Sequence, residues 1–256
     1  MPLSGAERDA VFAATKAAAR ALFISNDVID RFLETATPTQ IVGCKAMLEA
    51  EIAHRDAGKR ARLLRQAKLP VHKSAEDFDW THVRFPGAWK EDDMLSLAFI
   101  RSCEDLVFFG QTGRGKTHMA IALCMRAAAA GIPVRFWQTA QLVLELGSAK
   151  REGTLAKLLA DIARSKLLAL DEFGYVPFDV DGARLLYQVI SESYERRAII
   201  FTTNIEFSKW GTVFADDKLA QAIVDRVVHH GRLVEFAGPS HRLENSLMLG
   251  KGGAAA

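Results

Sequence analysis

The chain has 256 residues and lacks several features that mark specialised protein classes. It contains only three cysteines, Cys44, Cys103 and Cys124, which form neither a disulfide framework nor a zinc-ligand pattern and fit a reducing compartment. No apolar run approaches the roughly 20 residues that cross a bilayer. The N-terminus also lacks the apolar core of a signal peptide. We therefore expect a cytoplasmic protein with no membrane partner.

The sequence also has no large excess of charge of one sign, since 33 Lys and Arg face 31 Asp and Glu. Apolar residues make up 49% and charged residues 25%, which excludes a disordered or fibrous chain. Net charge alone therefore predicts no polyanionic partner. Positive charge is nevertheless concentrated between residues 55 and 73, where seven basic residues face one acid, Asp56. The basic residues are Arg55, Lys59, Arg60, Arg62, Arg65, Lys68 and Lys73.

The first part of the chain has a helical pattern. Residues 6–68 are rich in alanine, with aliphatic residues at spacings of three and four and interruptions at Pro38 and Gly43. Thr37 before Pro38 predicts the start of a second long helix. We expect a helical N-terminal domain over 1–75 that binds DNA or a partner, a second domain over 76–250 and a flexible tail over 251–256.

From residue 92 onward, short apolar runs alternate with amphipathic helices. The runs that we assign to strands are 105–109, 134–137, 167–170, 198–202 and 233–236. Such alternation is typical of a parallel sheet covered by helices on both faces. The sequence therefore predicts an α/β domain with a parallel five-stranded sheet, preceded by a small all-α domain.

A phosphate-binding loop follows the first of these strands. Residues 110–117, Gly-Gln-Thr-Gly-Arg-Gly-Lys-Thr, match the full pattern G-x-x-x-x-G-K-[ST] between a predicted strand and a predicted helix. Backbone N–H groups and the helix N-terminus bind phosphate, Lys116 reaches the outer phosphates and the Thr117 hydroxyl ligates Mg²⁺. The residues expected to bind the nucleotide are Gly110, Thr112, Gly113, Arg114, Gly115, Lys116, Thr117 and His118.

Two carboxylates end the strand at 167–170. Asp171 is expected to hold Mg²⁺ together with Thr117, and Glu172 is expected to orient and polarise the attacking water. A glutamate at this point favours hydrolysis over phosphoryl transfer. The sequence contains no Asn-Lys pair for reading guanine, so ATP with Mg²⁺ is the expected cofactor.

Three further polar residues are candidates for the catalytic site. Asn204 follows the strand at 198–202 and is expected to sense the γ-phosphate. Arg226 is expected to reach a neighbouring subunit's nucleotide as an arginine finger, and Arg242 to contact the nucleotide of its own chain. The alternatives are a turn residue for Asn204 and weak surface ion pairs for the two arginines. The pair His229 and His230 has no third ligand at helical spacing and is not expected to bind a metal.

The order of these motifs resembles the insertion-sequence transposition helper ATPases of the IstB family, AAA+ proteins related to the DnaC-type helicase loaders. The resemblance rests on 110–123, 170–178, Thr203-Asn204, 207–214, 225–230 and 240–243. Phe173 stands where the family usually has Leu, and His241 where Tyr is common. Ala222 stands where the loaders have an additional arginine, which favours the transposition reading.

The resemblance implies an AAA+ P-loop NTPase that forms an ATP-dependent homo-oligomer on duplex DNA, largely without regard to sequence, and stimulates a partner transposase. It also favours DNA contacts by the seven basic residues, which would otherwise be read as a solvated helix face. Lys150 and Arg151, expected in a loop after the second strand, are further candidates for DNA contact. The alternatives are a replicative helicase loader and a nucleotide-gated DNA-binding adaptor with little hydrolysis.

Overall fold

The computed structural model describes residues 5–76, 78–214 and 216–244, and these belong to two compact units. The units are Met1–Arg62 and Leu63–Ala256, so the division falls within helix α3 (Pro38–Gln66). The sequence pattern places the domain boundary later, at residue 75. The earlier division reflects packing, because Leu63 and Ala67 are buried in the core of the second unit. The predicted tail 251–256 lies outside the described residues.

The first unit contains α1 (Gly5–Ala21), α2 (Asn26–Thr35) and most of α3. Reciprocal hydrogen bonds cap α3: the Thr37 N–H donates to Gln40 Oε1 (2.8 Å) and the Gln40 N–H donates to Thr37 Oγ1 (3.4 Å). The expected helix start is therefore confirmed. Two other expectations are wrong: the chain breaks between α1 and α2, where Phe23 has a φ of 63°, and Gly43 does not interrupt α3.

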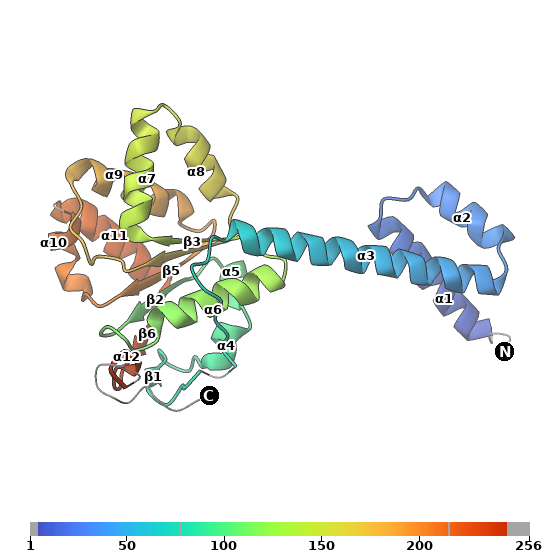
Figure 1. Ribbon diagram of the computed structural model, residues 1–256, viewed down its shortest axis with the longest axis horizontal. Helices are drawn as coiled ribbons and strands as arrows, with labels where there is room; N and C mark the ends of the chain where they lie inside the picture. Colours follow the sequence, from blue (N-terminus) through green and yellow to red (C-terminus); the bar gives the residue numbers. More distant parts are fainter. Residues whose placement is uncertain (1–4, 77, 215, 245–256) are drawn as a thin grey trace. The chain divides into compact units, whose positions relative to one another are not determined.

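The second unit is built on a six-stranded sheet with the order β1-β6-β2-β5-β4-β3 (Figure 1). The strands are β1 (Val83–Arg84), β2 (Asp105–Phe109), β3 (Val134–Gln138), β4 (Leu167–Asp171), β5 (Ala198–Thr203) and β6 (Gly231–Phe236). Strands β2 to β6 are parallel, which confirms the five predicted strands. Strand β1 pairs antiparallel with β6 and adds an edge that the sequence pattern did not indicate.

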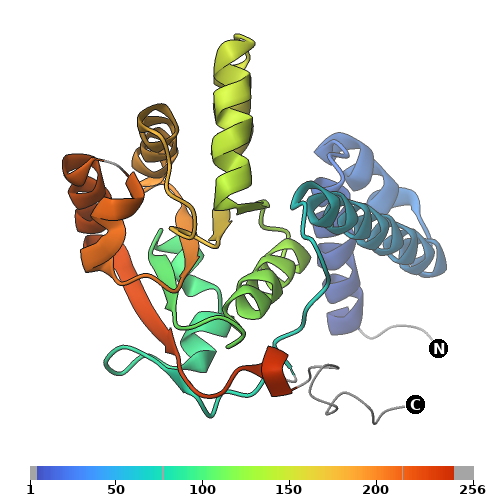
Figure 2. The ribbon, with the colours of Figure 1, turned by 60° about the vertical axis from the view of Figure 1, so that its left-hand side comes forward.

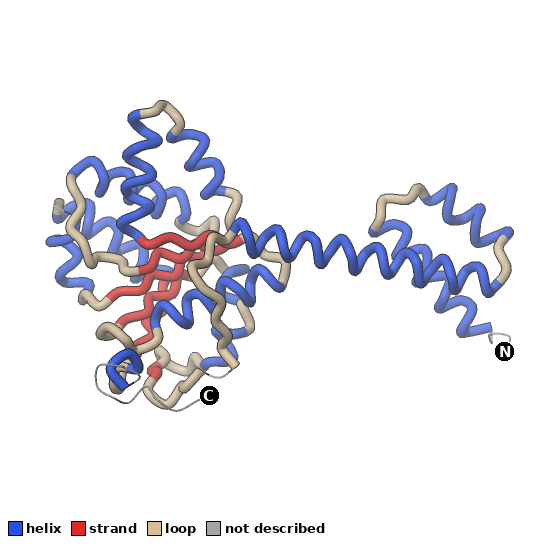
Figure 3. The backbone as a smooth tube through the Cα atoms, in the orientation of Figure 1, coloured by secondary structure: helices blue, strands red, loops and turns tan. Residues whose placement is uncertain are grey.

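Helices cover both faces of this sheet (Figures 1, 2 and 3). On one face lie α4 (Glu91–Leu95), α5 (Ala98–Arg101) and α6 (Lys116–Ala129). On the other lie α7 (Thr139–Arg151), α8 (Leu155–Ala163), α9 (Val180–Ser193), α10 (Trp210–Phe214) and α11 (Asp217–His230). A 3₁₀ turn (Phe207–Lys209) precedes α10, and α12 (His241–Glu244) follows β6. Within the described parts of the chain, no helix is long and apolar enough to cross a membrane.

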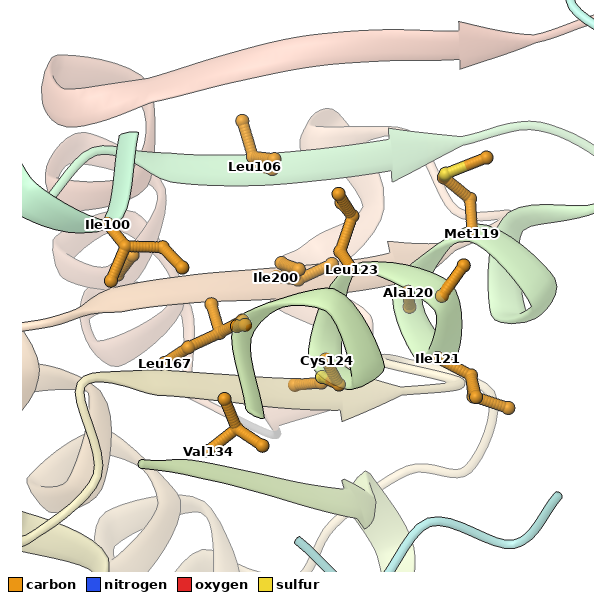
Figure 4. Packing of buried hydrophobic residues seen from close by; sticks show 14 of the residues in the cluster. Ile100, Leu106, Met119, Ala120, Ile121, Leu123, Cys124, Val134, Leu167 and Ile200 are labelled. Carbon is orange, nitrogen blue, oxygen red and sulfur yellow. The ribbon is translucent and has the colours of Figure 1, made fainter. Parts of the chain in front are cut away.

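The core of the second unit consists of two apolar layers, one on each side of the sheet. Every residue of β4 and β5 is buried, as expected for central parallel strands covered on both faces. Figure 4 shows Leu106 and Ile200 of the sheet facing Met119 and Leu123 of α6. This packing holds α6 across the strands and places its first residue, Lys116, at their carboxyl ends. Ligand sites in open α/β sheets form at that edge.

Candidate nucleotide-binding site

The phosphate loop connects β2 to α6 and has the conformation that its glycines permit. Gly113 and Gly115 have φ values of +85° and +91°, in the left-handed region that favours glycine. A Cβ atom at Gly115 would lie 2.8 Å from the ring of Phe78, and one at Gly113 would lie 2.1 Å from Ser240 Oγ. The loop therefore depends on glycine both for its backbone and for the close approach of two other segments.

Lys116 folds back over this loop. Its Nζ donates hydrogen bonds to the backbone oxygens of Gly110 (2.6 Å) and Gln111 (2.8 Å), and the residue is only 6% exposed. Burial lowers the pKa of the Lys116 ammonium to about 8, partly opposed by the nearby carboxylate of Asp171. The positive charge is thus held inside the loop, where it can bind a phosphate group.

Asp171 connects three elements at the end of β4. Its Oδ1 accepts hydrogen bonds from the hydroxyls of Thr117 (2.8 Å) and Thr202 (2.5 Å), and the residue is 3% exposed. A carboxylate beside a hydroxyl supplies the oxygen ligands that Mg²⁺ prefers. The donor set formed by Thr117 and Asp171 therefore fits this ion. The described residues contain no group of three or more His, Cys, Asp or Glu side chains that could hold a metal ion.

Glu172 follows with an exposed side chain and a constrained backbone. Its φ is +56°, and its N–H donates to Thr202 Oγ1 at 3.0 Å. The next residue is also held, because the Phe173 N–H donates to the Thr202 carbonyl at 2.8 Å. The Phe173 ring is fully buried against Phe201 and Trp210. This packing anchors the turn that carries Glu172.

The phosphate loop, His118 and Glu172 line a cavity of about 800 Å³, a size typical of small-molecule sites. The expected residues that line it are Thr112, Gly113, Arg114, Gly115, Lys116, Thr117, His118, Glu172 and Arg242. Sequence reasoning missed several further lining residues, namely Val71, Phe78, Asp79, Ile121, Tyr175, Thr202 and His241. The closely spaced aromatic residues between α3 and α4, which include Phe78 and Trp80, were a visible signal for Phe78. An isolated threonine within a strand, such as Thr202, carries no such signal.

Lys73 also lines this cavity, although the sequence analysis grouped it with the DNA-binding residues. Its segment is attached to α6, because the Lys73 N–H lies 3.0 Å from Met125 Sδ and the Ser74 carbonyl lies 2.7 Å from His118 Nε2. These contacts hold Lys73 at the wall of the cavity. This placement favours a nucleotide contact for Lys73.

The other candidate catalytic residues lie at different distances from the cavity. Arg242 is in α12, which rests on the phosphate loop through a hydrogen bond from the His241 N–H to the Gly113 carbonyl (3.0 Å). Asn204 is exposed just beyond β5 and is not among the described residues that line the cavity.

Arg226 lies on α11, also outside the described cavity lining. Its guanidinium carbon lies 5.3 Å from the ring centroid of Tyr187 and 6.0 Å from that of Tyr194, and its Nη1 donates to the Ala222 carbonyl. Tyr194 in turn hydrogen-bonds His229 Nδ1 at 3.0 Å. The guanidinium is therefore oriented by contacts within its own chain.

The candidate DNA-binding residues are all exposed but differ in their contacts. Arg55 pairs with Glu51 on α3 at 2.7 Å. Within the described ranges, no ion pair involves Lys59, Arg60, Arg62 or Arg65 of α3, or Lys68 just beyond the helix. Lys150 lies 3.3 Å from Asp181, and Arg151 donates to Ser148 Oγ. Both stand in the last turn of α7, so the expectation of a loop here is wrong: α7 continues to Arg151.

Comparison with known proteins agrees with this architecture. The model of a family described as IstB-like ATP binding protein matches residues 34–248. The insertion sequence IS5376 putative ATP-binding protein of Geobacillus stearothermophilus is 38% identical over 197 residues, which cover 77% of this chain and 78% of the relative. The insertion sequence IS21 putative ATP-binding protein of Pseudomonas aeruginosa is 36% identical over 209 residues, covering 81% and 78%.

A solved structure supports the fold. AMPPCP-bound DnaA from Aquifex aeolicus matches with a TM-score of 0.53 at 18% identity, covering 69% of this chain and 54% of that chain. At this level of identity the likeness concerns the fold alone, which is that of an AAA+ P-loop domain.

Proposed function

The chain belongs to the IstB-like ATP-binding protein family, and on this basis we propose that it is a cytoplasmic ATPase that assembles on duplex DNA and regulates a partner transposase. The observation that carries the proposal is that the phosphate loop and Glu172 line one cavity, while Asp171 accepts a hydrogen bond from Thr117 of that lining. The insertion-sequence context of the relatives supports a transposase as the partner.

Nucleotide binding rests on the loop and on the segments around it. Lys116 and the loop N–H groups bind the phosphates, and Thr117 with Asp171 holds Mg²⁺. When bound, Mg²⁺ supplies positive charge that neutralises phosphate oxygens. Val71, Phe78 and Ile121 supply apolar surface for the base, and Lys73 and Arg242 add positive charge at the cavity.

Hydrolysis rests on Glu172. Its carboxylate is exposed and lines the cavity, so it can accept a proton from a water molecule positioned there. Asn204 stands beyond the end of the adjacent strand and senses the γ-phosphate after the site closes. Arg226 acts on the nucleotide of a neighbouring copy, which makes hydrolysis depend on assembly.

DNA binding rests on the exposed basic residues of α3 and on Lys68, two residues beyond it, with Lys150 and Arg151 as further contacts. Cationic side chains that contact phosphates give binding that depends on salt and is largely indifferent to sequence. The candidates that stay assigned to DNA are Arg55, Lys59, Arg60, Arg62, Arg65 and Lys68. Lys73 is assigned to the nucleotide instead, because it lines the cavity.

Electron microscopy with long duplex DNA tests this proposal. We expect ATP-dependent filaments or stacked rings for the wild type and none for Lys116→Ala, which removes the buried ammonium. Lys157→Ala is the matched control, because Lys157 is exposed on α8 and lies outside the described cavity lining. Addition of the transposase encoded beside the protein then tests for a change in transposition.

Two alternatives predict different results. Particles that ignore duplex DNA but bind single strands and a replicative helicase would favour a helicase loader. A nucleotide-gated adaptor predicts that Glu172→Gln leaves function nearly intact. The ATPase proposal instead predicts that Glu172→Gln remains trapped on DNA in its ATP-bound assembly.

A further inference from the structure

Thr202 occupies a central position between the two catalytic acids. It is the fifth residue of β5, which pairs with β4, and it is 1% exposed while still contributing to the cavity wall. No sequence motif identifies it. Its importance comes from its contacts with three successive residues of the neighbouring segment.

The single hydroxyl of Thr202 contacts both acids. It donates to Asp171 Oδ1 at 2.5 Å and accepts the Glu172 N–H at 3.0 Å. A hydroxyl has one hydrogen and two lone pairs, so both bonds form at once with these directions. The Thr202 backbone carbonyl also accepts the Phe173 N–H at 2.8 Å. Residues 171–173 are therefore all held by one residue.

The bond to Glu172 holds a backbone that needs a fixed partner. A φ of +56° is disfavoured for a residue with a Cβ atom, and such conformations persist only where surrounding contacts determine them. The Glu172 side chain is exposed, so its direction depends on its backbone. Loss of the Thr202 hydroxyl would leave the Glu172 N–H without its partner.

The bond to Asp171 has a different consequence. Thr117 donates to the same carboxylate oxygen at 2.8 Å. In the proposed function the Thr117 hydroxyl serves as a Mg²⁺ ligand, so Thr202 remains as the hydroxyl that orients Asp171. A carboxylate that is oriented by a second group binds a metal ion better than one that is free to rotate.

We propose that Thr202 is a positioning residue for ATP hydrolysis, whose hydroxyl sets the Asp171 carboxylate and the Glu172 backbone together. This inference rests on the proposed ATPase function. The Thr202 hydroxyl then has two effects. It contributes to Mg²⁺ affinity through Asp171, and it contributes to turnover through Glu172.

Thr202→Val tests the proposal, because it removes the hydroxyl and nearly preserves the shape. We expect kcat to fall about 10- to 100-fold, which is less than the roughly 10²- to 10⁴-fold contribution of a general base, because Glu172 is retained but less well oriented. In calorimetric titrations of a non-hydrolysable ATP analogue, we expect affinity without Mg²⁺ to stay unchanged. The gain in affinity on adding Mg²⁺ should shrink by about 10-fold, the lower end of the effect seen when the outer partners of metal ligands are removed. Thr202→Ser restores the hydroxyl and should recover both quantities.

Thr203→Val is the matched control. Thr203 is also 1% exposed and follows Thr202 on β5, but its hydroxyl donates to the Phe173 carbonyl and accepts the Ile205 N–H, and its two hydrogen bonds reach neither Asp171 nor Glu172. We expect its kcat and Mg²⁺ response to stay within about threefold of wild type. If Thr202→Val does not fold, Thr202→Cys replaces it, and its weaker hydrogen bonds predict an intermediate loss.

The outcomes distinguish this inference from the function on which it rests. If wild type hydrolyses ATP and Thr202→Val matches Thr203→Val in both measurements, the positioning role is wrong. Failure of Thr202→Ser to recover would also overturn it. If wild type does not hydrolyse ATP even with duplex DNA, the proposed ATPase function itself fails.

Discussion

The Nε2 atom of His118 lies 2.7 Å from the backbone carbonyl oxygen of Ser74, so the first turn of α6 is joined to the segment that forms one wall of the nucleotide cavity. The His118 ring also contacts Phe78 edge-on, with 5.4 Å between the ring centroids. The Ala67 carbonyl accepts the Phe136 N–H of β3. The segment after α3 is therefore attached both to the sheet and to the phosphate-loop helix.

Substitution of His118 should loosen this wall. His118→Ala removes the bond to Ser74 and the contact with Phe78, and we expect ATP affinity to fall about 3- to 10-fold, as for loss of one hydrogen bond and some packing. Calorimetric titration with ATP checks this. His72→Ala, in an exposed position of the same segment, is the control. Equal affinities for the two variants would show that the His118 bond has no part in binding.

ATP affinity should depend on pH through Lys116. Its pKa of about 8 means that the side chain is charged at neutral pH and becomes neutral as the pH rises above 8. Phosphate binding favours the charged form, so above pH 8 the free protein must take up a proton to bind. We expect affinity to fall with rising pH, by up to about tenfold per unit.

Titrations at a series of pH values test this dependence. Lys116→Arg should bind ATP with an affinity that does not change over the same range, because arginine stays charged. A wild-type affinity that stays constant through pH 9 would contradict the expected titration of Lys116.

Mixing of variants tests the role of Arg226. Arg226→Ala leaves its own nucleotide site intact, and Glu172→Gln abolishes hydrolysis but keeps the ATP-bound assembly and Arg226 intact. We expect each alone to hydrolyse little ATP. An equal mixture should recover about a quarter of wild-type turnover, because half of the sites are intact and half of those have a neighbour with the finger. Absence of recovery, with both proteins present on DNA, would exclude action between subunits.

Tyr187 should support this action. Its ring lies under the Arg226 guanidinium at 5.3 Å, and a cation–π contact of this kind orients the charge. We expect Tyr187→Leu to lower turnover about 3- to 10-fold and to be rescued by Glu172→Gln in the same mixing assay. Loss of turnover without rescue would indicate damage to the variant's own site.

The salt dependence of DNA binding tests the exposed face of α3. Each phosphate contact adds about 0.9 to the slope of log affinity against log salt concentration for duplex DNA. The double variant Lys59→Ala/Arg62→Ala should therefore lower the slope by about 2. Lys45→Ala is the control, because its ammonium pairs with Glu49 at 2.7 Å on the same helix. Fluorescence anisotropy over a range of salt concentrations measures both, and equal slopes would remove α3 from the DNA-binding surface.

The sequence by itself determined the parts of this protein that depend on neighbouring residues. Residues 110–117 form a loop because the glycines, the lysine and the helix start follow one another directly, and apolar runs such as 198–202 show the central strands. Thr37 before Pro38 similarly predicted the start of α3. These signals are local, since backbone conformation and strand burial are largely set within a few residues.

Only the tertiary structure decided which distant residues meet around the loop. Thr202 and Ser74 belong to two separate segments and have no motif, yet Thr202 donates to Asp171 and lines the cavity, and the Ser74 carbonyl contacts His118. The tertiary structure also places Lys73, which the sequence analysis grouped with the DNA-binding residues, in the lining of the cavity. Such contacts follow from strand pairing and from the packing of α6 on the sheet, which bring together residues that are remote in sequence.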